Sequence, residues 1–539
     1  MPAGAAPARV PQAASARRRE LLPELGLAAV AIAATAWVAY STRGVTFWSD
    51  DWGFIVDRRG WDGQALFGNH NGHLVAAHAL AYKLLFEIFG LGSVWPYKLL
   101  ALGLHLLVVA LLYIYARRRV SRDLAAVAAG LLVIFGSAAE VLAWQFHAGN
   151  LMAVSAGLGA LLCLERRDRR GELAAAVLLG VSLASSSFGA PFVLGAVVEI
   201  ALGRDRRRRW WIATVPIVPY LLWRLSVGGD PGGSTLTVVG SYVERGLARS
   251  TGALLALPLE WGIPLLLGLV ALLARRVLSP LPVSPRLWAT VAMALGYWLL
   301  IAVARGDLGE EYTERYLYPG ALLILLVVLE LGRGAALPRR ALPLAAIGLA
   351  LVTLVNVGTF KRQAGIVRDR SHEVAVAVAA LEVAGDRADP RFVPSAMVYG
   401  RNAGQILEAL DDLGSPYGGA REIRRRPPAL AALADATTAQ AEGVALRPGK
   451  NATRCGPVAA TAPDGSAELA LPPGGLDLRA RGQAVDVFVR RYAASFPAAA
   501  TAHLDPGGIG RLEAPRDGDA ATPWNVRVQP ASAAQRCGG

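Results

Sequence analysis

The amino-acid sequence predicts a mainly α-helical, polytopic membrane protein that ends in a small extracytoplasmic β-sandwich. Three observations predict this fold class. Of the 539 residues, 54% are hydrophobic, and the mean hydropathy is +0.39. Several apolar stretches reach the length of about 20 residues that a helix needs to cross a bilayer. Runs of arginine separate these stretches in a way that fits alternating sides of a membrane.

The apolar stretches define about 11 candidate transmembrane helices by this length criterion. Together they form a predicted transmembrane domain over residues 21–358. In chain order the stretches are 21–41, 97–116, 124–142, 149–164, 172–189, 190–203, 210–227, 252–274, 287–304, 317–333 and 341–358. The stretch 190–203 is short and opens on Pro191.

The arginine runs test this layout independently. With the N-terminus in the cytoplasm, every run falls in a cytoplasmic segment, as the positive-inside rule requires. The runs lie at 17–19, 117–119, 166–167, 206–209, 275–276 and 339–340. An odd number of spans then places the tail, 359–539, outside. Residues 1–20 are predicted to be a disordered, basic cytoplasmic leader before an uncleaved anchor.

The net charge of +14 needs no nucleic acid as a partner. Arginines that set the topology account for much of it, and the inner leaflet of a plasma membrane is anionic. The expected partners of this surface are therefore membrane lipids. The composition, rich in alanine, arginine and glycine, indicates a bacterial protein. We thus expect a multi-pass protein of a bacterial plasma membrane.

The outer tail has two predicted parts. Residues 359–442 read as a helical or mixed segment, with helices at 371–385, 401–413 and 428–441 and one strand at 391–399. From residue 443 the apolar residues alternate with a period of two, which predicts an antiparallel sandwich over 443–539. The expected strands lie at 444–447, 467–471, 476–479, 485–490 and 524–529.

The chain has three cysteines. Cys163 lies inside a predicted span and is expected to be inert packing. Cys455 and Cys537 lie in the outer tail, where a disulfide persists once formed. An even count in this compartment favours a Cys455–Cys537 bridge, with two free thiols as the alternative.

Asp50 and Asp51 follow the first apolar stretch directly, between Trp48 and Trp52. Adjacent carboxylates cost free energy through repulsion and desolvation, and membrane proteins keep such groups mostly for function. One of them would act as general base on an acceptor hydroxyl, or both would help to bind a divalent cation such as Mg²⁺ or Mn²⁺. Partial burial of both would raise the pKa of one. The alternative is a helix end with a solvated acidic turn.

These carboxylates open the first outer loop, 42–96, which is long enough to carry function. Residues 72–89 predict an amphipathic helix along the outer membrane surface. Its apolar stripe consists of Leu74, Ala77, Ala81, Leu84, Leu85 and Ile88. Four tryptophans fit an aromatic belt at the membrane interface, namely Trp48, Trp52, Trp61 and Trp95.

The segment Asn69, His70, Asn71, Gly72 and His73 is rich in imidazoles and amides. Such groups bind sugar hydroxyls, phosphates or metals. On a helix the two histidines would share a face, but no third ligand stands near them in the sequence. The alternative is a polar turn that caps the surface helix.

A third motif contains Glu314, Arg315, Tyr316 and Tyr318 and is preceded by Glu310 and Glu311. It lies at the outer end of the tenth predicted span, where an arginine between aromatic rings suits a phosphate or pyrophosphate at headgroup depth. The alternative is an aromatic anchor in which Arg315 pairs locally with Glu311.

Weaker candidates surround these motifs. A polar group at the turn between the third and fourth spans is expected to line the same cavity. Its members are Glu140, Trp144, Gln145, His147 and Asn150. His78 and His105 are expected to pack inside the bundle or at the lipid interface. Glu199 and Glu330 are expected to be buried ion-pair partners.

The order of these features resembles the GT-C class of integral membrane glycosyltransferases. That class includes protein O-mannosyltransferases, arabinofuranosyltransferases and lipid A aminoarabinose transferases. The resemblance rests on the first span, Asp50 and Asp51 at its outer end, the loop helix with its Asn/His-rich start, and the stretch 315–318. A terminal sandwich is similar to the carbohydrate-binding-like domain of several mycobacterial cell-wall members. Other outer-loop motifs of the protein mannosyltransferases have no counterpart here.

The resemblance implies an inverting transferase that takes a sugar from a polyprenyl-phosphate carrier outside the cytoplasm. The acceptor would be a cell-envelope glycan, a lipid or a protein. Asp50 or Asp51 would be the base, and the other would orient the acceptor or hold a metal. The substrate-binding set would be Arg315, Tyr316, Tyr318, His70, His73, Asn69, Trp52, Gln145 and His147.

Two other functions fit parts of the pattern. A non-catalytic translocator or scaffold for envelope assembly would place ionisable groups near mid-membrane and often shows repeated halves. Here the polar clusters stand at the outer ends of the spans, and no repeat is visible. A sensor would need a cytoplasmic signalling domain, for which the sequence offers no segment. The transferase is therefore the preferred prediction.

Overall fold

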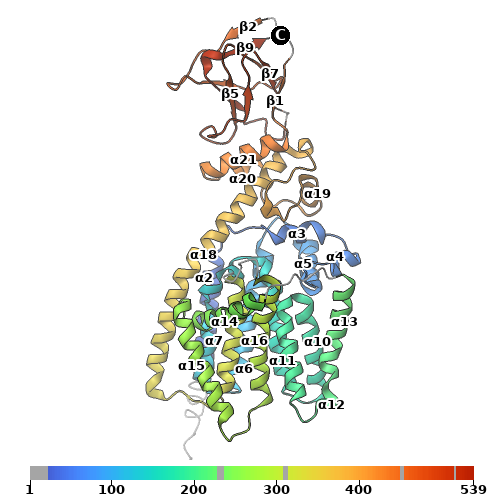
Figure 1. Cartoon of the computed structure of the whole chain (residues 1–539), viewed down its shortest axis with the longest axis vertical. Coiled ribbons are helices and arrows are strands. Elements are labelled where there is room, and N and C mark those ends of the chain that lie inside the picture. Colours follow the sequence, from blue (N-terminus) through green and yellow to red (C-terminus); the bar gives the residue numbers. More distant parts are fainter. Residues whose placement is uncertain (1–21, 228–235, 307–313, 450–453, 515–516, 539) are drawn as a thin grey trace, which may run out of the picture. The chain divides into compact units, whose positions relative to one another are not determined.

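The computed structural model describes residues 22–227, 236–306, 314–449, 454–514 and 517–538 (Figure 1). The predicted leader 1–20 lies outside these residues, as do Glu310 and Glu311. The chain divides into two compact units. Unit 1 comprises Met1–Arg43, Asp62–Tyr82 and Trp95–Val367; unit 2 comprises Gly44–Trp61, Lys83–Val94 and Arg368–Gly539. The first outer loop therefore contributes to both.

Unit 1 is a bundle in which the long helices run side by side (Figure 1). Its α-helices are α2 (Leu22–Ser41), α4 (Gly63–Phe67), the start of α5 (Ala76–Phe89), α6 (Trp95–Arg117), α7 (Arg122–Val133), α8 (Ala139–Ala143), α9 (Ala148–Leu164), α10 (Arg169–Ser185), α11 (Ala190–Ala201), α12 (Arg206–Arg209), α13 (Trp211–Ser226), α14 (Leu236–Ala253), α15 (Leu259–Leu278), α16 (Pro285–Arg305), α17 (Leu317–Leu331) and the first part of α18 (Leu342–Ala384). Short 3₁₀ turns join them at η1 (Gly136–Ala138), η2 (Gln145–His147), η3 (Ser187–Gly189), η5 (Glu314–Tyr316) and η6 (Arg339–Ala341).

Each predicted apolar stretch contains helical residues. In the described part of the chain, six helices are long and apolar enough to cross a membrane, or seven if the bent pair Arg122–Val133 and Gly136–Ala143 counts as one crossing. The boundary predicted at 252 is wrong. Residues expected in a loop form α14, and the next helix starts only at Leu259, because Pro258 occupies its N-cap position.

The outward faces of several helices are apolar, which fits a polytopic membrane protein. On α15, the side chains of Leu267 and Leu272 are 63% and 57% exposed. On α5, two residues of the predicted stripe, Leu84 and Ile88, are 48% and 67% exposed, whereas Leu74 before the helix is buried. A contiguous apolar surface of this kind is unfavourable in water and indicates contact with lipid or another apolar phase.

α18 corrects the predicted boundary at residue 358. The sequence suggested that a span ends there and a new helix starts at 371, whereas one helix of 43 residues runs through both. No proline occurs between Pro343 and Pro390, so nothing interrupts the backbone hydrogen bonds. Lys361 and Arg362 change the polarity of the helix surface but not its conformation.

The helical part of unit 2 contains α3 (Asp50–Asp57), α19 (Ala403–Leu413), α20 (Ala420–Arg424), α21 (Pro428–Ala441) and the 3₁₀ turns η7 (Gly385–Arg387) and η8 (Ala396–Val398). The helices predicted at 401–413 and 428–441 therefore form. The strand predicted at 391–399 is wrong, because this segment is irregular and ends in η8. Pro394 in its middle has no N–H to give to a strand ladder.

Two antiparallel sheets complete unit 2. One has the strand order β1-β7-β4-β9-β2 and the other β3-β8-β5-β6. The strands are β1 (Leu446–Pro448), β2 (Arg454–Pro457), β3 (Ala467–Ala470), β4 (Leu476–Ala480), β5 (Val485–Arg490), β6 (Ala502–Leu504), β7 (Ile509–Leu512), β8 (Asn525–Gln529) and β9 (Ala534–Gly538). A shared core that includes Leu478, Val487 and Val526 lies between the sheets, as in a sandwich. The pattern did not reveal β2, β6, β7 and β9, which are short and hold few alternating apolar residues.

Cys455 on β2 and Cys537 on β9 face each other in the strand register and form a disulfide. They stand 82 residues apart in the sequence. Closing so long a loop removes much conformational entropy from the unfolded chain. The bridge fastens β2, which forms one edge of its sheet, to the neighbouring β9.

Replacing both cysteines (Cys455→Ser with Cys537→Ser) should destabilise the sandwich by about 2–5 kcal/mol. Limited proteolysis of the full-length protein should then cut within 443–539 much faster than in the wild type. Cys163→Ser, which removes a thiol outside the sandwich, serves as the control. Equal cleavage rates in the double variant and the control would show that the bridge contributes little.

Candidate active site

A polar cluster lies at one end of unit 1, where α8, η2, η3 and η5 come together. We call it the Arg315 cluster. Its members come from parts of the sequence that are far apart. They are His73, Glu140, Gln145, His147, Asn150, Ser186, Glu314 and Arg315. In the sequence, seven of them stand in three separate motifs, and Ser186 belongs to none of these motifs.

Hydrogen bonds fix the orientation of the His147 ring. The amide Nδ2 of Asn150 lies 2.9 Å from Nδ1 of His147, and the Ser186 hydroxyl donates to Oδ1 of Asn150 over 2.8 Å. Nε2 of the same ring lies 3.4 Å from Oε1 of Glu140. His147 is therefore oriented with Nε2 toward a carboxylate.

Glu140 also contacts Arg315, whose Nη1 lies 3.4 Å from the same Oε1. The Glu140 side chain is 18% exposed and the Arg315 side chain 24%. The structure thus pairs Arg315 with a distant glutamate, and Glu311, the partner suggested by the sequence, lies outside the described residues. This contact ties the η5 turn to α8.

Several arginines make the cluster electropositive. Burial, together with the positive charges of Arg305, Arg224 and Arg315, lowers the pKa of His73 to about 4. His73 is therefore neutral at physiological pH. Among the described residues, the buried Nη1 atom of Arg224 has no hydrogen-bond partner. Cations that converge on a buried neutral imidazole form a setting suited to an anion.

Glu314, next to Arg315, has an unusual ionisation. Burial is the main cause that raises its pKa from 4.5 to about 7, and the nearby charge of Glu140 adds to the effect. The positive charge of Arg249 and a hydrogen bond from Gln363 lower the pKa of Glu314, but by less. A carboxyl group with a pKa near neutrality can give or take a proton under physiological conditions. Glu314 was part of the sequence motif, but only packing reveals this property.

The predicted residues His70 and Asn69 build a turn. His70 and His73 exchange two backbone hydrogen bonds across Asn71 and Gly72. The polar turn, which was the alternative in the sequence analysis, therefore forms, and the two histidines do not share a helix face. Asn71 and Gly72 both adopt positive φ, and Oδ1 of Asn69 accepts a bond from the Gly72 N–H. Because glycine has no Cβ atom, Gly72 adopts a positive φ without strain. This turn presents His73 to the Arg315 cluster.

Three further predicted residues have structural contacts. The Tyr318 hydroxyl lies 2.7 Å from Nδ1 of His105 inside the bundle. Tyr316 is buried, and its carbonyl accepts a hydrogen bond from Tyr297. Gln145 is buried beside His147 in η2. These contacts position the Arg315 cluster.

Asp50 and Asp51 belong to unit 2, at the first turn of α3. Asp51 has no exposed surface, and its Oδ2 accepts a hydrogen bond from the Trp48 N–H over 3.2 Å. Asp50 is half-buried, and its charge helps to raise the pKa of Tyr399 to about 12, an effect that comes mainly from burial of the phenol. Asp51 therefore shapes the turn, while Asp50 keeps access to solvent.

Contacts with the segment around Met397 and Tyr399 hold the backbone near Asp50 and Asp51 in place. Ser49 adopts a φ of 51°, and its N–H donates to the Met397 carbonyl over 2.6 Å. A methyl group on Gly53 would come within 2.9 Å of the Tyr399 ring, so a glycine allows the ring to approach the helix. These constraints hold the carboxylates in one orientation.

The predicted aromatic belt is wrong for two of its four members. Trp48 and Trp52 are 5% and 0% exposed, and Trp52 packs 6.5 Å from the Tyr417 ring. Buried indoles belong to a protein core and not to a lipid interface, and Trp52 offers no surface for a sugar. Trp61 and Trp95 are exposed, as a belt requires.

Among the described residues, no group of three or more His, Cys, Asp or Glu side chains is arranged to hold a metal ion. Within the described residues, the carboxylate pair at the start of α3 therefore has no third ligand of this kind beside it.

Comparisons with known proteins give one match. No protein-family model matches the chain, and no curated protein matches it. Among solved structures, the chain is similar to the crystal structure of ArnT from Cupriavidus metallidurans bound to undecaprenyl phosphate. The two share 15% sequence identity, with 71% of this chain and 84% of that chain covered and a TM-score of 0.45.

The raised pKa of Glu314 predicts that the stability of the folded protein depends on pH. Its folded pKa is raised, so the folded state holds a proton that the unfolded state has lost between about pH 4.5 and 7. Wild-type stability should fall as pH rises through this window, and Glu314→Gln should remove that fall. Melting temperatures in detergent at pH 5 and pH 8 measure it, with the exposed Glu260→Gln as control. Equal changes in melting temperature between pH 5 and pH 8 for the wild type and Glu314→Gln would contradict the raised pKa of Glu314.

Proposed function

We propose that this chain is an inverting membrane glycosyltransferase. It takes a sugar from a polyprenyl-phosphate donor and transfers it to a cell-envelope glycan, lipid or protein acceptor on the extracytoplasmic side. The observation that carries the proposal is the Arg315 cluster. It gathers arginines around a neutral histidine at one end of an apolar helix bundle.

This combination suits a ligand with a phosphate head and a long apolar tail. Guanidinium groups bind phosphate through paired hydrogen bonds, and they remain charged in partly buried sites. Apolar helix surfaces next to the cluster would hold the polyprenyl chain. Neutral His73 can donate or accept a hydrogen bond without adding charge. The sequence resemblance of 315–318 to GT-C transferases leads to the same ligand class.

In the proposed reaction, Asp50 is the base. Its carboxylate takes the proton from the acceptor hydroxyl while that oxygen attacks the anomeric carbon. The bond between this carbon and the phosphate oxygen breaks, and its electron pair leaves with the polyprenyl phosphate. A single displacement of this kind inverts the anomeric configuration. Asp51, which is fully buried and bound to the Trp48 N–H, is a positioning residue.

The unit 1 residues have complementary roles. Arg315 and its neighbouring arginines stabilise the negative charge that grows on the leaving phosphate. Glu140 orients Arg315, and the bonds from Ser186 through Asn150 orient His147. Such a chain of positioned donors lowers the cost of rearranging dipoles during the reaction.

A translocator is the alternative, and the interior of the bundle argues against it. A translocator needs ionisable groups that change partners near mid-membrane. His105 on α6 has both ring nitrogens engaged, Nδ1 with the Tyr318 hydroxyl and Nε2 with the Val133 carbonyl at 3.2 Å. These two contacts hold the ring in a structural role.

Sugar transfer from radiolabelled polyprenyl-phosphate donors, in membranes that express each variant, tests the proposal. Asp50→Asn should reduce transfer by about 10²–10⁴-fold, the usual contribution of a general base. Arg315→Gln should also reduce it strongly, because the phosphate loses a bidentate cation. Asp51→Asn keeps an oxygen for the Trp48 N–H and should retain more activity than Asp50→Asn.

Arg275→Gln serves as the matched control, because Arg275 is exposed on α15 and far along the sequence from both motifs. Equal expression of all variants must be verified. If the wild type transfers label and both Asp50→Asn and Arg315→Gln match it, the assigned roles are wrong. A wild type that moves intact donor across vesicle membranes without transfer would favour the translocator.

A further inference from the structure

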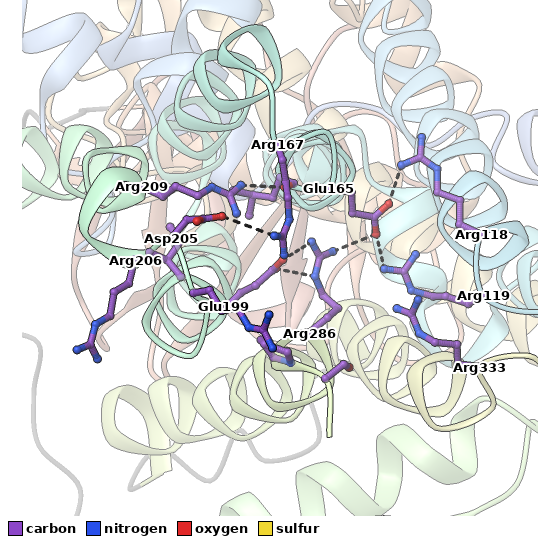
Figure 2. A pocket seen from close by; sticks show the side chains of 16 residues that line it. Arg118, Arg119, Glu165, Arg167, Glu199, Asp205, Arg206, Arg209, Arg286 and Arg333 are labelled. Atoms are coloured by element: carbon purple, nitrogen blue, oxygen red, sulfur yellow. Dashed lines mark hydrogen bonds and ion pairs between the residues drawn. The ribbon is translucent and has the colours of Figure 1, made fainter. Parts of the chain in front are cut away.

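A second charged site lies elsewhere in unit 1. Eight arginines and three carboxylates line a pocket of about 270 Å³, which we call the arginine pocket (Figure 2). The charged lining residues are Arg118, Arg119, Glu165, Arg167, Glu199, Arg204, Asp205, Arg206, Arg209, Arg286 and Arg333. None of them belongs to the Arg315 cluster.

Four helices place this pocket at the opposite end of the bundle from the Arg315 cluster. α9 and α11 start next to the cluster and end at the pocket, and α17 does the same. α16 runs in reverse, from Arg286 in the pocket to Arg305 near His73. The 17 residues of α9 alone span about 25 Å at the rise of an α-helix. The two sites are therefore separate.

The inner wall of the pocket is rigid. Glu165 lies 2.7 Å from Arg118 and 3.6 Å from Arg286, and it also pairs with Arg119 (Figure 2). The Arg119 and Arg286 side chains are only 1% and 6% exposed. Burial opposes ionisation of Glu165, but the three arginines outweigh it and keep its pKa below the usual value. The wall is thus a fixed array of charges.

Positive charge remains in excess after this pairing. Eight arginines stand against three lining carboxylates, which leaves five positive charges. Glu330 and Glu172, which bind Arg119, Arg333 and Arg209 from behind the wall, reduce the excess to three. Arg204 is exposed and, among the described residues, makes no ion pair. Arg167 is 67% exposed and reaches Asp205 only at 3.6 Å (Figure 2).

We propose that the arginine pocket binds a phosphate-bearing anion. The lining cations are all arginine, whose planar fork matches phosphate oxygens in pairs, whereas a lysine would offer a single point charge. An anion there neutralises the excess charge and joins the ends of α9, α11, α16 and α17. The phosphate comes either from the headgroup of an anionic lipid or from a soluble phosphate compound. The proposal does not depend on the proposed transferase activity.

Two probes separate these sources. Native mass spectrometry of the full chain, purified from membranes that contain phosphatidylglycerol, reports a bound lipid. Thermal unfolding of delipidated protein in detergent, with and without inorganic pyrophosphate, reports a soluble anion. The test variant combines Arg167→Gln and Arg204→Gln, because neither residue belongs to the rigid wall. We expect binding to weaken by at least about tenfold, given two lost charge-assisted contacts.

The control variant combines Arg170→Gln and Arg207→Gln. Both residues are exposed, lie next in sequence to the pocket segments and do not line it, so the net charge changes equally. Lipid bound to wild type and control but lost from the test variant assigns the site to a headgroup. Pyrophosphate stabilisation with the same pattern assigns it to a soluble anion. Equal behaviour of test and control variants, or no binding of either probe to the wild type, overturns the proposal.

Discussion

The rest of unit 1 depends on one constraint, which is that charge inside an apolar helix bundle must be paired. Glu330 has no exposed side-chain surface, and it pairs with Arg119, which is itself 1% exposed. Removing one partner of such a pair costs about 3–5 kcal/mol, because the remaining charge stays buried. On α16 and α17 the buried charges, Arg286 and Glu330, lie close to a helix end, where partners from several helices reach them. Both polar sites of unit 1 lie at such helix ends.

The sequence predicts the helices well because apolar length is a local property. It predicts the sandwich strands where alternation extends over four or more residues, as in β4, β5 and β8, and it misses β2, β6, β7 and β9. It fails at the junction near residue 358, because a change from apolar to polar side chains does not end a helix. Backbone hydrogen bonds continue until a proline or a capping group stops them.

In the candidate site, too, single residues could be predicted from the sequence, whereas contacts between residues far apart in the sequence could not. Asp50, Arg315 and His147 could be singled out from residue type and position alone. The contacts between them and their partners could not be predicted, because Glu140 and Arg315 lie 175 residues apart and Ser186 carries no motif. The raised pKa of Glu314 also depends on burial. Aromatic residues mislead in the same way, since Trp52 is a core residue that resembles a membrane anchor only in sequence.

The geometry around Arg315 has a chemical consequence. Its contact with Glu140 is 3.4 Å, whereas a strong charge-assisted bond between nitrogen and oxygen is about 2.7–2.9 Å. A phosphate oxygen at the shorter distance would therefore compete for the same guanidinium. His147 gives Glu140 a second partner at 3.4 Å, so the carboxylate does not become isolated when Arg315 turns to a ligand. In the proposed mechanism, the contact with Glu140 would hold Arg315 in place before a phosphate-bearing ligand binds.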